Sequence, residues 1–402
     1  MLGGVAPEHE VSIISALQAA AALNRDRYRP VPLYIAKDGT WYTGDTLLEV
    51  ETYRDMDALR TSATPVALHP GGYGTLRVVE VPPDSRWKRA RRTPLRYDID
   101  VMLLGLHGGP GEDGSVQGLC ETMGVPYTGS GVLGSSVGMD KGLSKRLCQQ
   151  VGLPVVDFVV LHSGTWAHHE EEHLARCVDT LGLPLVVKPA RLGSSIGIAR
   201  ADTRAELDAA IEDAFRYDSK VIVEEAVADL REINCSVLGT PTEATPSVLE
   251  EPVASESEDV LSFQDKYMRE DEGAGSGAKV NRPEGMASLD RIIPAELDEA
   301  TTASIQDMAV QIFQLFECAG VARIDFMMDR STGTVYFNEI NTIPGSFSFY
   351  LWEPSGIPFD ELMHRTIQAA LQRFEEARGR IRTYDVNLLS ERSLSGLKGS
   401  KG

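Results

Sequence analysis

The sequence predicts an α/β protein with α+β parts, on the strength of two observations. Apolar segments alternate with helical ones: an Ala-rich helix is expected from Ser12 to Leu23, and the strand-like "YRPVPLYIA" follows it. Further on, the apolar "DIDVMLLGLHG" runs into the glycine-rich "HGGPGEDGSVQG". Buried strands that alternate with helices and end in such turns are typical of open sheets, which bind ligands at the carboxyl ends of their strands.

The order of the predicted elements divides the chain into four parts. Residues 1–129 are expected to form the open α/β domain. Residues 130–217 would form a small central α+β domain, because the helix-like "MDKGLSKRLCQQVGLP" and "AELDAAIEDAFRY" flank short strands. Residues 218–382 would form a C-terminal α+β domain that contains a hairpin and a helix from Asp298 to Phe316. Residues 383–402, with "SLSGLKGSKG", have the composition of a disordered tail.

Two further segments do not fit a simple connection between elements. Residues 254–294 contain "REDEGAGSGAKVNRPEG", and this polar stretch is too long for a plain loop, which predicts a mobile lid or a disordered segment. At the start, "MLGGVAPEHEVS" enters a helix directly from a Gly-Gly turn. An α/β domain normally places an apolar strand before such a turn, so we expect the chain to begin inside its first strand.

The charge balance and the cysteines argue against several classes of protein. The chain has 39 basic and 59 acidic residues, and this formal net charge of −20 argues against non-specific binding to nucleic acid or to anionic membranes. No apolar run reaches the ~18 residues that a membrane-spanning helix needs. The five cysteines are scattered without metal-ligand spacing, which favours reduced thiols. We therefore expect a cytoplasmic protein that binds neither nucleic acid nor membrane.

Two strand-like segments, "ARIDFMM" and "VYFNEIN", carry oxygen-bearing side chains among apolar ones. Alternation along a strand places Glu339 and Asn341 on one face, and it places Arg323 and Asp325 together as well. The turn "DRSTGT" can bring the two faces together in an antiparallel hairpin. Two carboxylates and an amide, without His or Cys, suit Mg²⁺, and Arg323 could stabilise phosphoryl or oxyanion charge. The competing interpretation is a structural salt bridge between Arg323 and Asp325.

Three further segments are weaker candidates. In "KPARLGSSIG", Lys188 ends an apolar strand, and small residues would let backbone N–H groups approach an anion. This segment matches neither GxxxxGK[ST] nor GxGxxG, so both phosphate motifs are rejected, and a plain hairpin turn is the alternative. In "EHEVS", Glu10 and Ser12 have the placement of a helix cap. "HGGPGEDG" would either bind substrate or form a plain turn, with His107 structural.

These motifs together resemble those of the D-alanine–D-alanine ligases of the ATP-grasp superfamily, over nearly the whole chain. The motifs that carry the resemblance are "EHEVS", "HGGPGEDGSVQG", "PYTGSGVLGSSVGMDK", "VVKPARLGSSIG", "EEAVADLREINCSVLG", "QDKY", "ARIDFM" and "FNEINTIPG". The resemblance implies the ATP-grasp fold and an ATP-dependent ligase that joins two D-alanines, through an acyl phosphate, for peptidoglycan precursors. Its partners would be small-molecule substrates, and a homodimer is left open.

The resemblance also implies roles for individual residues. The residues implied to bind ATP are Lys141, Lys188, Ser195, Glu224, Glu225, Val227, Glu232 and Lys266. Among them, the lysines would contact phosphates, residues 224–227 the adenine, and Glu232 the ribose. The residues implied to hold two Mg²⁺ ions, with Mn²⁺ as an alternative, are Asp325, Glu339 and Asn341. The residues implied to be catalytic are Glu10, Ser194, Tyr267, Arg323 and Lys266.

Each implied catalytic residue has a stated task. Glu10 would hold the amine of the first substrate and would link to Ser194 and Tyr267, a chain that closes the lid over the site. Lys266, in the lid, would reach the transferred phosphate. Arg323 would stabilise the tetrahedral intermediate.

Two departures from the family pattern fall on the acceptor side of the implied site. After the Pro-Gly turn, family members supply a Ser-Leu pair that holds the carboxylate of the second substrate, whereas this chain reads "GSFSFYLWEPSG", which is shorter and more aromatic. The lid is also longer. We expect either that Ser346 or Ser348 binds the acceptor, or that the aromatic residues form a pocket for a larger acceptor.

Three functions therefore stay open. The first is a Mg-ATP-dependent D-alanine–D-alanine ligase. The second is a relative that joins an amino acid to a different acceptor, such as a D-hydroxy acid. The third is a nucleotide-binding relative that has lost catalysis, and the presence of Lys266, Arg323 and Asp325 argues against it. The intact ATP and donor residues favour the first.

Overall fold

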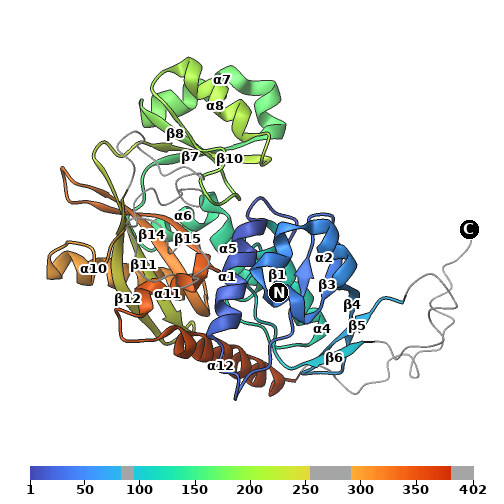
Figure 1. The fold of residues 1–402 in the computed structure, drawn as a ribbon. Helices are drawn as coiled ribbons and strands as arrows, with labels where there is room; N and C mark the ends of the chain where they lie inside the picture. The colour runs from blue at the N-terminus through green and yellow to red at the C-terminus, as the bar shows by residue number, and fades with distance from the viewer. Residues whose placement is uncertain (83–94, 254–290, 382–402) are drawn as a thin grey trace, which may run out of the picture.

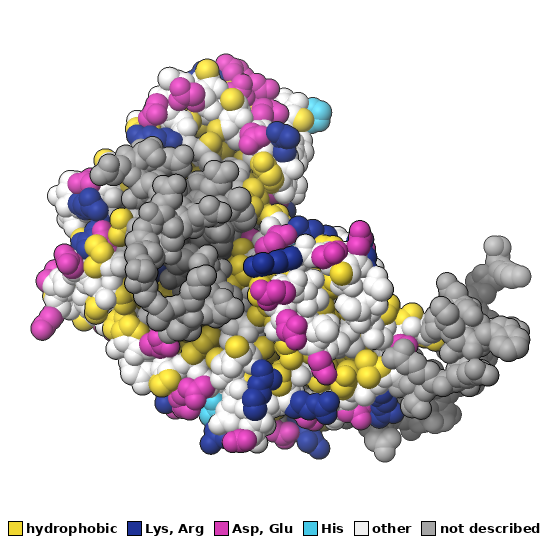
Figure 2. All heavy atoms as spheres, viewed as in Figure 1, with side chains coloured by type: hydrophobic (Ala, Val, Ile, Leu, Met, Phe, Trp, Pro, Cys, Tyr) yellow, Lys and Arg dark blue, Asp and Glu magenta, His cyan; other side chains and the backbone are white. Residues whose placement is uncertain are grey.

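The computed structural model describes residues 1–82, 95–253 and 291–381 of the chain. In these residues, three sheets form, and helices pack on them (Figure 1). Most of the expected lid, with Lys266 and Tyr267, lies outside the described residues, as does the expected tail. On the face shown in Figure 2, acidic and basic side chains are interspersed over the described surface.

The N-terminal domain is built on a six-stranded sheet in the order β1-β2-β3-β4-β5-β6. Its elements are β1 (Leu2–Gly3), α1 (His9–Ala22), β2 (Tyr34–Ile35), β3 (Trp41–Thr43), η1 (Asp45–Leu48), η2 (Val50–Arg54), α2 (Met56–Ser62), β4 (Thr64–Pro70), β5 (Leu76–Glu80), β6 (Arg96–Ile99), η3 (Gly109–Gly111) and α4 (Ser115–Met123). Only β1 and β2 are parallel among the described pairs of this sheet. The others are antiparallel, as the short turn between β2 and β3 requires.

The first residues of the chain lie in the centre of this domain. Leu2 and Gly3 form β1, which pairs with β2. On its other side, the Met1 amine donates to the Leu103 carbonyl oxygen at 2.6 Å. Burial lowers the pKa of the Met1 amine to about 5. The glycine turn before α1 is therefore entered from a short buried strand.

The central domain is a four-stranded antiparallel sheet in the order β7-β10-β8-β9. Its elements, with two preceding helices, are α5 (Val132–Met139), α6 (Lys141–Gln150), β7 (Phe158–His162), α7 (Ser163–Leu181), β8 (Leu185–Pro189), β9 (Ala199–Ala201), α8 (Arg204–Ala214) and β10 (Lys220–Glu225). α7 and α8 cover one face of the sheet (Figure 1). Since β10 pairs with both β7 and β8, a domain boundary after residue 217 would separate β10 from its sheet.

The C-terminal domain is a five-stranded antiparallel sheet in the order β13-β12-β11-β14-β15. Its elements are β11 (Leu230–Gly239), β12 (Ala244–Pro252), β13 (Arg291–Ile292), α10 (Glu299–Leu315), β14 (Gly320–Asp329), β15 (Val335–Asn341), η5 (Gly345–Ser348), α11 (Phe349–Trp352) and α12 (Phe359–Arg378). The helix predicted to start at Asp298 is confirmed: the Asp298 side chain caps α10 by accepting a hydrogen bond from the Thr301 N–H.

The N-terminal and C-terminal domains share one hydrophobic core. α12 packs against both α1 and β14, so Ile367 and Met363 lie in the same cluster as Leu104 and Leu106 (Figure 1). All five cysteines are buried and free. No helix in the described part of the chain is both long and apolar enough to cross a membrane.

Candidate active site

One face of the five-stranded sheet is polar, and a row of oxygen-bearing side chains crosses it. The strand register places Asn234 between Glu250 and Asp325. Asp325 in turn lies opposite Glu339, so the predicted hairpin is confirmed. The alternate residues of β14, such as Ile324, pack on the other face against α10. Strand alternation therefore separates a polar face from an apolar face that belongs to the core.

Protein cations neutralise the carboxylates of this row. Arg323 Nε and Nη2 donate to Asp325 Oδ1 and Oδ2 at 2.6 and 2.7 Å. Lys141 Nζ lies 3.0 Å from Glu339 Oε2. Burial opposes the charge on Arg323, but the attraction of Asp325 outweighs it and raises the pKa of Arg323 well above its usual value. The salt bridge that the sequence left as an alternative is thus present.

The same groups fit a hard divalent cation. Asn341 Nδ2 donates to Asp325 Oδ2 at 3.0 Å, and Glu339 lies on the same strand face as Asn341, so the amide and the two carboxylates are neighbours. Among the described residues, no group of three or more His, Cys, Asp and Glu could hold a metal, and this set has two carboxylates and one amide. The ammonium of Lys141 already lies against Glu339, which marks a position that requires positive charge.

Two lysines from different elements meet beside this row. Lys141 is the first residue of α6, and Lys188 lies near the end of β8. Lys188 Nζ donates to Glu224 Oε2 at 2.7 Å and to Asn338 Oδ1 at 3.0 Å. Burial opposes the charge on Lys141, but Glu339 outweighs it and raises the pKa of Lys141. Lys141 therefore keeps its positive charge next to the polar face.

The remaining residues implied to bind ATP border the junction between the central and C-terminal sheets. Glu225 ends β10, and Val227 lies in the connection to β11. Glu232 lies on β11 opposite Met327. Ser195 lies in the loop after β8, in left-handed backbone with φ of 58°.

Ser194 is bound by Glu8 and not by Glu10. Ser194 Oγ donates to Glu8 Oε1 at 2.5 Å, across the gap between the central domain and the start of α1. Glu10 instead pairs with Lys37 at 2.5 Å, and both of these side chains are exposed. Residues two apart on a helix point in roughly opposite directions, so only one of the two glutamates can face Ser194. The expected link from Glu10 to Ser194 is wrong.

Two glycines leave room for the Glu8 carboxylate. A Cβ atom at Gly108 would lie 2.0 Å from Glu8 Oε2, and one at Gly193 would lie 2.6 Å from Oε1. Gly108 also has a φ of 67°, which disfavours any other residue. The glycine-rich motifs "HGGPGEDG" and "KPARLGSSIG" thus both lie against the carboxylate of Glu8. The glycines in these two motifs are the signal in the sequence that could have indicated Glu8.

Glu112 is a second buried carboxylate that the sequence analysis missed. Its Oε2 accepts from the Gly108 N–H at 3.2 Å, and its Oε1 accepts from the Ile343 N–H at 3.0 Å. Burial, together with the charge of Glu8, raises the pKa of Glu112 to about 7. Glu112 therefore ties the glycine loop of the N-terminal domain to the Pro-Gly turn after β15.

A buried serine and histidine from the N-terminal domain support the start of η5. Ser15 Oγ accepts from the Ser346 N–H at 2.8 Å and lies 2.8 Å from His107 Nε2. Burial lowers the pKa of His107 to about 4, so the ring is neutral near pH 7. No role for Ser15 could be predicted from the sequence, because its partners are remote along the chain.

The segment after the Pro-Gly turn is strained and contains two buried hydroxyls. Ser346, Phe347 and Ser348 have φ values of 54°, 52° and 50°, which are uncommon for residues other than glycine. Both serines are buried, and neither hydroxyl has a hydrogen-bond partner among the described residues. Leaving a buried hydroxyl without a partner is costly, so the pair indicates a position for a polar group of a ligand or of solvent.

An arginine that the sequence analysis missed lies against the aromatic part of this segment. The Arg291 guanidinium lies 4.1 Å from the centroid of the Tyr350 ring, and Arg291 also pairs with the buried Glu250. Asn234 Nδ2 donates to Glu250 Oε1 at 3.0 Å, so this pair continues the polar row of the sheet. The aromatic residues thus help to build a second buried charge pair beside Arg323.

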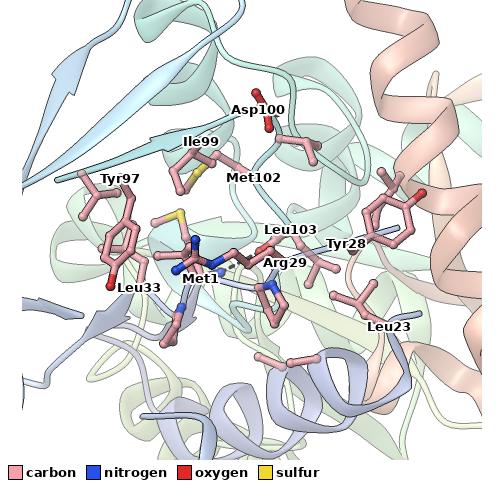
Figure 3. Close-up of a pocket in the computed structure, with 18 of the residues that line it drawn as sticks. Met1, Leu23, Tyr28, Arg29, Leu33, Tyr97, Ile99, Asp100, Met102 and Leu103 are labelled. Carbon is pink, nitrogen blue, oxygen red and sulfur yellow. Dashed lines mark hydrogen bonds between the residues drawn. The ribbon is translucent and has the colours of Figure 1, made fainter. Parts of the chain in front are cut away.

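A cavity of about 620 Å³ lies elsewhere, in the N-terminal domain (Figure 3). Met1, Leu33 and Met102 line it, together with residues of α1 and of the segment 96–103. None of the residues predicted for the site lines this cavity. The candidate active site is therefore the polar face of the C-terminal sheet and the loops that converge on it.

Known proteins match this chain along its length. The model for the D-ala D-ala ligase N-terminus matches residues 1–130, and the model for the D-ala D-ala ligase C-terminus matches residues 147–368. The D-alanine–D-alanine ligase of Thermosipho melanesiensis is 35% identical over 392 residues, which is 96% of each chain.

Two solved structures are also similar to the chain. The D-alanine-D-alanine ligase from Coxiella burnetii has a TM-score of 0.72 and 29% identity, over 94% of this chain and 95% of that one. The VanG D-Ala:D-Ser ligase from Enterococcus faecalis has a TM-score of 0.71 and 28% identity, over 92% and 97%. With the three sheets and the polar hairpin in place, these matches show that the chain has the ATP-grasp fold and belongs to the D-alanine–D-alanine ligase family.

Proposed function

We propose that the chain is an ATP- and Mg²⁺-dependent ligase that joins D-alanine to a second amino acid, with D-alanine as the first candidate for the acceptor. The observation that carries this proposal is that three cations converge on the β14–β15 hairpin. Lys141 and Arg323 pair with Glu339 and Asp325, and Lys188 donates to Asn338. A carboxylate is too poor an electrophile for an amine. Phosphoryl transfer from ATP first makes an acyl phosphate and releases ADP, and the amine then attacks the carbonyl carbon as inorganic phosphate leaves.

Asp325, Glu339 and Asn341 would hold Mg²⁺, and we propose two ions. When bound, Mg²⁺ supplies neutralisation of the charge on phosphate oxygens. Two hydrogen bonds to Asp325 fix the guanidinium of Arg323, which in this proposal would stabilise an oxyanion of the substrate.

The ATP phosphates would contact Lys141 and Lys188, and the adenine and ribose would bind along residues 224–227 and Glu232. The charges support this placement: both lysines face the junction of the two sheets, and each is paired with a carboxylate that an anionic ligand could replace. Lys266, from the lid, would add a third positive charge at the transferred phosphate.

The amine of the first D-alanine would bind Glu8 in this proposal. Glu8 is almost fully buried at the start of α1, with one oxygen on Ser194. An ammonium group that enters between α1 and the loop after β8 would neutralise this buried charge. Tyr267 would complete the chain that links the lid to Ser194.

The identity of the acceptor depends on local residues and not on the fold. The named relatives include a D-alanine-D-alanine ligase and a D-Ala:D-Ser ligase with nearly equal TM-scores of 0.72 and 0.71. In this chain the segment that departs from the family pattern contains the buried hydroxyls of Ser346 and Ser348, and its Tyr350 lies against Arg291. A ligase with a different acceptor is therefore the second candidate function.

The first test is a phosphate-release screen. Purified protein with MgATP is offered single amino acids and pairs, and ADP, phosphate and ligated product are measured. We expect a ligated product with D-alanine as donor. We also expect that phosphate is released only when D-alanine is present. Absence of release with every amino acid would contradict the proposal and favour the inactive relative.

Ser346→Ala and Ser348→Ala test the acceptor site. A hydrogen bond to a charged group contributes about 1.5–3 kcal/mol, so loss of one is expected to raise the KM of the acceptor roughly ten- to a hundredfold. The KM of ATP should change little, because the nucleotide lies on the other side of Arg323 in this proposal. If neither serine variant changes the acceptor KM, the hydroxyls do not bind the acceptor.

A further inference from the structure

Lys145 is a buried cation to which the proposed reaction gives no role. It lies on α6, one turn after Lys141, and its side chain has no exposed surface. Its Nζ lies 2.8 Å from Glu224 Oε1. Lys141 reaches the C-terminal sheet, whereas Lys145 reaches the end of β10, so the two lysines of one helix face hold two different carboxylates.

Glu224 is therefore bound by two lysines at once. Lys145 lies at one oxygen, and Lys188 donates to the other at 2.7 Å. Burial opposes ionisation of Glu224, but the two lysines together outweigh it and lower the pKa of Glu224 to about 2. One positive charge is enough to neutralise this carboxylate, so charge neutralisation does not explain why a second lysine is present.

The two lysines differ in what they can reach. Lys188 has a second contact, to Asn338 on β15 at 3.0 Å, and its side chain keeps a small exposed surface. Lys145 is enclosed, and among the described residues its ion-pair partner is Glu224. A phosphate that draws Lys188 away would leave Glu224 buried and uncompensated if Lys145 were absent. Such an uncompensated buried charge is strongly unfavourable.

We propose that Lys145 is a positioning residue for nucleotide binding, which keeps Glu224 paired and oriented so that Lys188 can turn from Glu224 to the phosphates. This inference rests on the proposed function, because it assumes that the nucleotide lies along residues 224–227. It assigns separate tasks to the three lysines: Lys141 and Lys188 contact the phosphates, and Lys145 fixes the carboxylate beside the base.

The test is the binding of a non-hydrolysable ATP analogue with Mg²⁺, measured by calorimetry on the full-length protein. Lys145→Met is expected to weaken binding about tenfold or more, because the analogue must then compete with Glu224 for Lys188. The KM of D-alanine should stay within about twofold, so the effect separates ATP from amino acid. Lys145→Arg should restore most of the affinity, since it keeps the charge at this position.

Lys220→Met is the matched control. Lys220 also joins β10 to α6, through contacts of 2.6 and 2.7 Å to the two oxygens of Asp140, but it does not touch Glu224. We expect this variant to lower the melting temperature without changing the affinity for the analogue. Equal weakening by Lys145→Met and Lys220→Met would show that Lys145 is only structural.

The outcomes separate the inference from the proposed function. If the wild-type protein does not bind the analogue, the proposed function is wrong. If the wild type binds and Lys145→Met binds equally well, only the role of Lys145 is wrong. If Lys145→Met does not fold, Lys145→Gln and Lys145→Arg provide the comparison, and equal affinities in both would contradict the inference.

Discussion

Replacing Asp325 by Asn is expected to lower turnover by about a thousandfold or more, the largest effect of any single change considered. The variant keeps the size of the side chain but removes one of the two carboxylates proposed to hold Mg²⁺. It also loosens Arg323, whose guanidinium is fixed by two hydrogen bonds to Asp325. Glu339→Gln should act in the same direction. Turnover is measured as ADP release with saturating MgATP and amino acid.

Asp329→Asn is the control for this prediction. Asp329 ends the same strand, β14, and its side chain accepts hydrogen bonds from Ser331 in the exposed turn. Asp329→Asn removes the same charge as Asp325→Asn. Its turnover should stay within about twofold of the wild type if the loss in Asp325→Asn arises from the position of Asp325 in the site. Near-full activity in both Asp325→Asn and Glu339→Gln would rule out the metal assignment.

Glu8→Gln is expected to reduce kcat/KM for D-alanine about a hundredfold, whereas Glu10→Gln should have almost no effect. Glu8 is buried between two glycines and accepts a hydrogen bond from Ser194. A neutral amide there cannot neutralise the substrate ammonium. Glu10 pairs with Lys37 at the surface, where an ion pair contributes little. The two variants make the same change two positions apart at the start of α1.

The comparison is decided by steady-state kinetics with D-alanine as the varied substrate, together with melting curves for both variants. The ATP affinity of Glu8→Gln should be close to that of the wild type. A large loss of kcat/KM in Glu10→Gln, with little loss in Glu8→Gln, would restore the role first predicted for Glu10.

The hairpin could be predicted from sequence because its geometry is local. Strand alternation and one short turn are enough to bring Asp325 and Glu339 to the same place, and the register confirms it. Arg291 and Glu250 could not be found in this way. They are 41 positions apart, and only the pairing of β12 with β13 makes them neighbours.

The prediction of Glu10, where the structure has Glu8, shows a second limit of prediction from sequence. Within "EHEVS", either glutamate is compatible with a helix start, and the sequence does not say which side of the helix faces the loop after β8. Glu8 is fixed there by tertiary contacts, namely Ser194 and the space left by Gly108 and Gly193. The membership of β10 in the central sheet could not be predicted for the same reason. It depends on pairing with β7 and β8, which are distant along the chain.

The separate core of the central sheet has a consequence for how the molecule responds to its ligands. That core contains only residues between Val159 and Val223, whereas the other two domains are fused through α12. Polar contacts such as Glu8 to Ser194 and Lys188 to Asn338 tie the central sheet to its neighbours at the site. Contacts of this kind exchange readily with water and substrate, unlike an apolar core. A bound nucleotide would therefore act as a removable cross-link between two rigid bodies, and it would set the angle between them without altering the packing inside either.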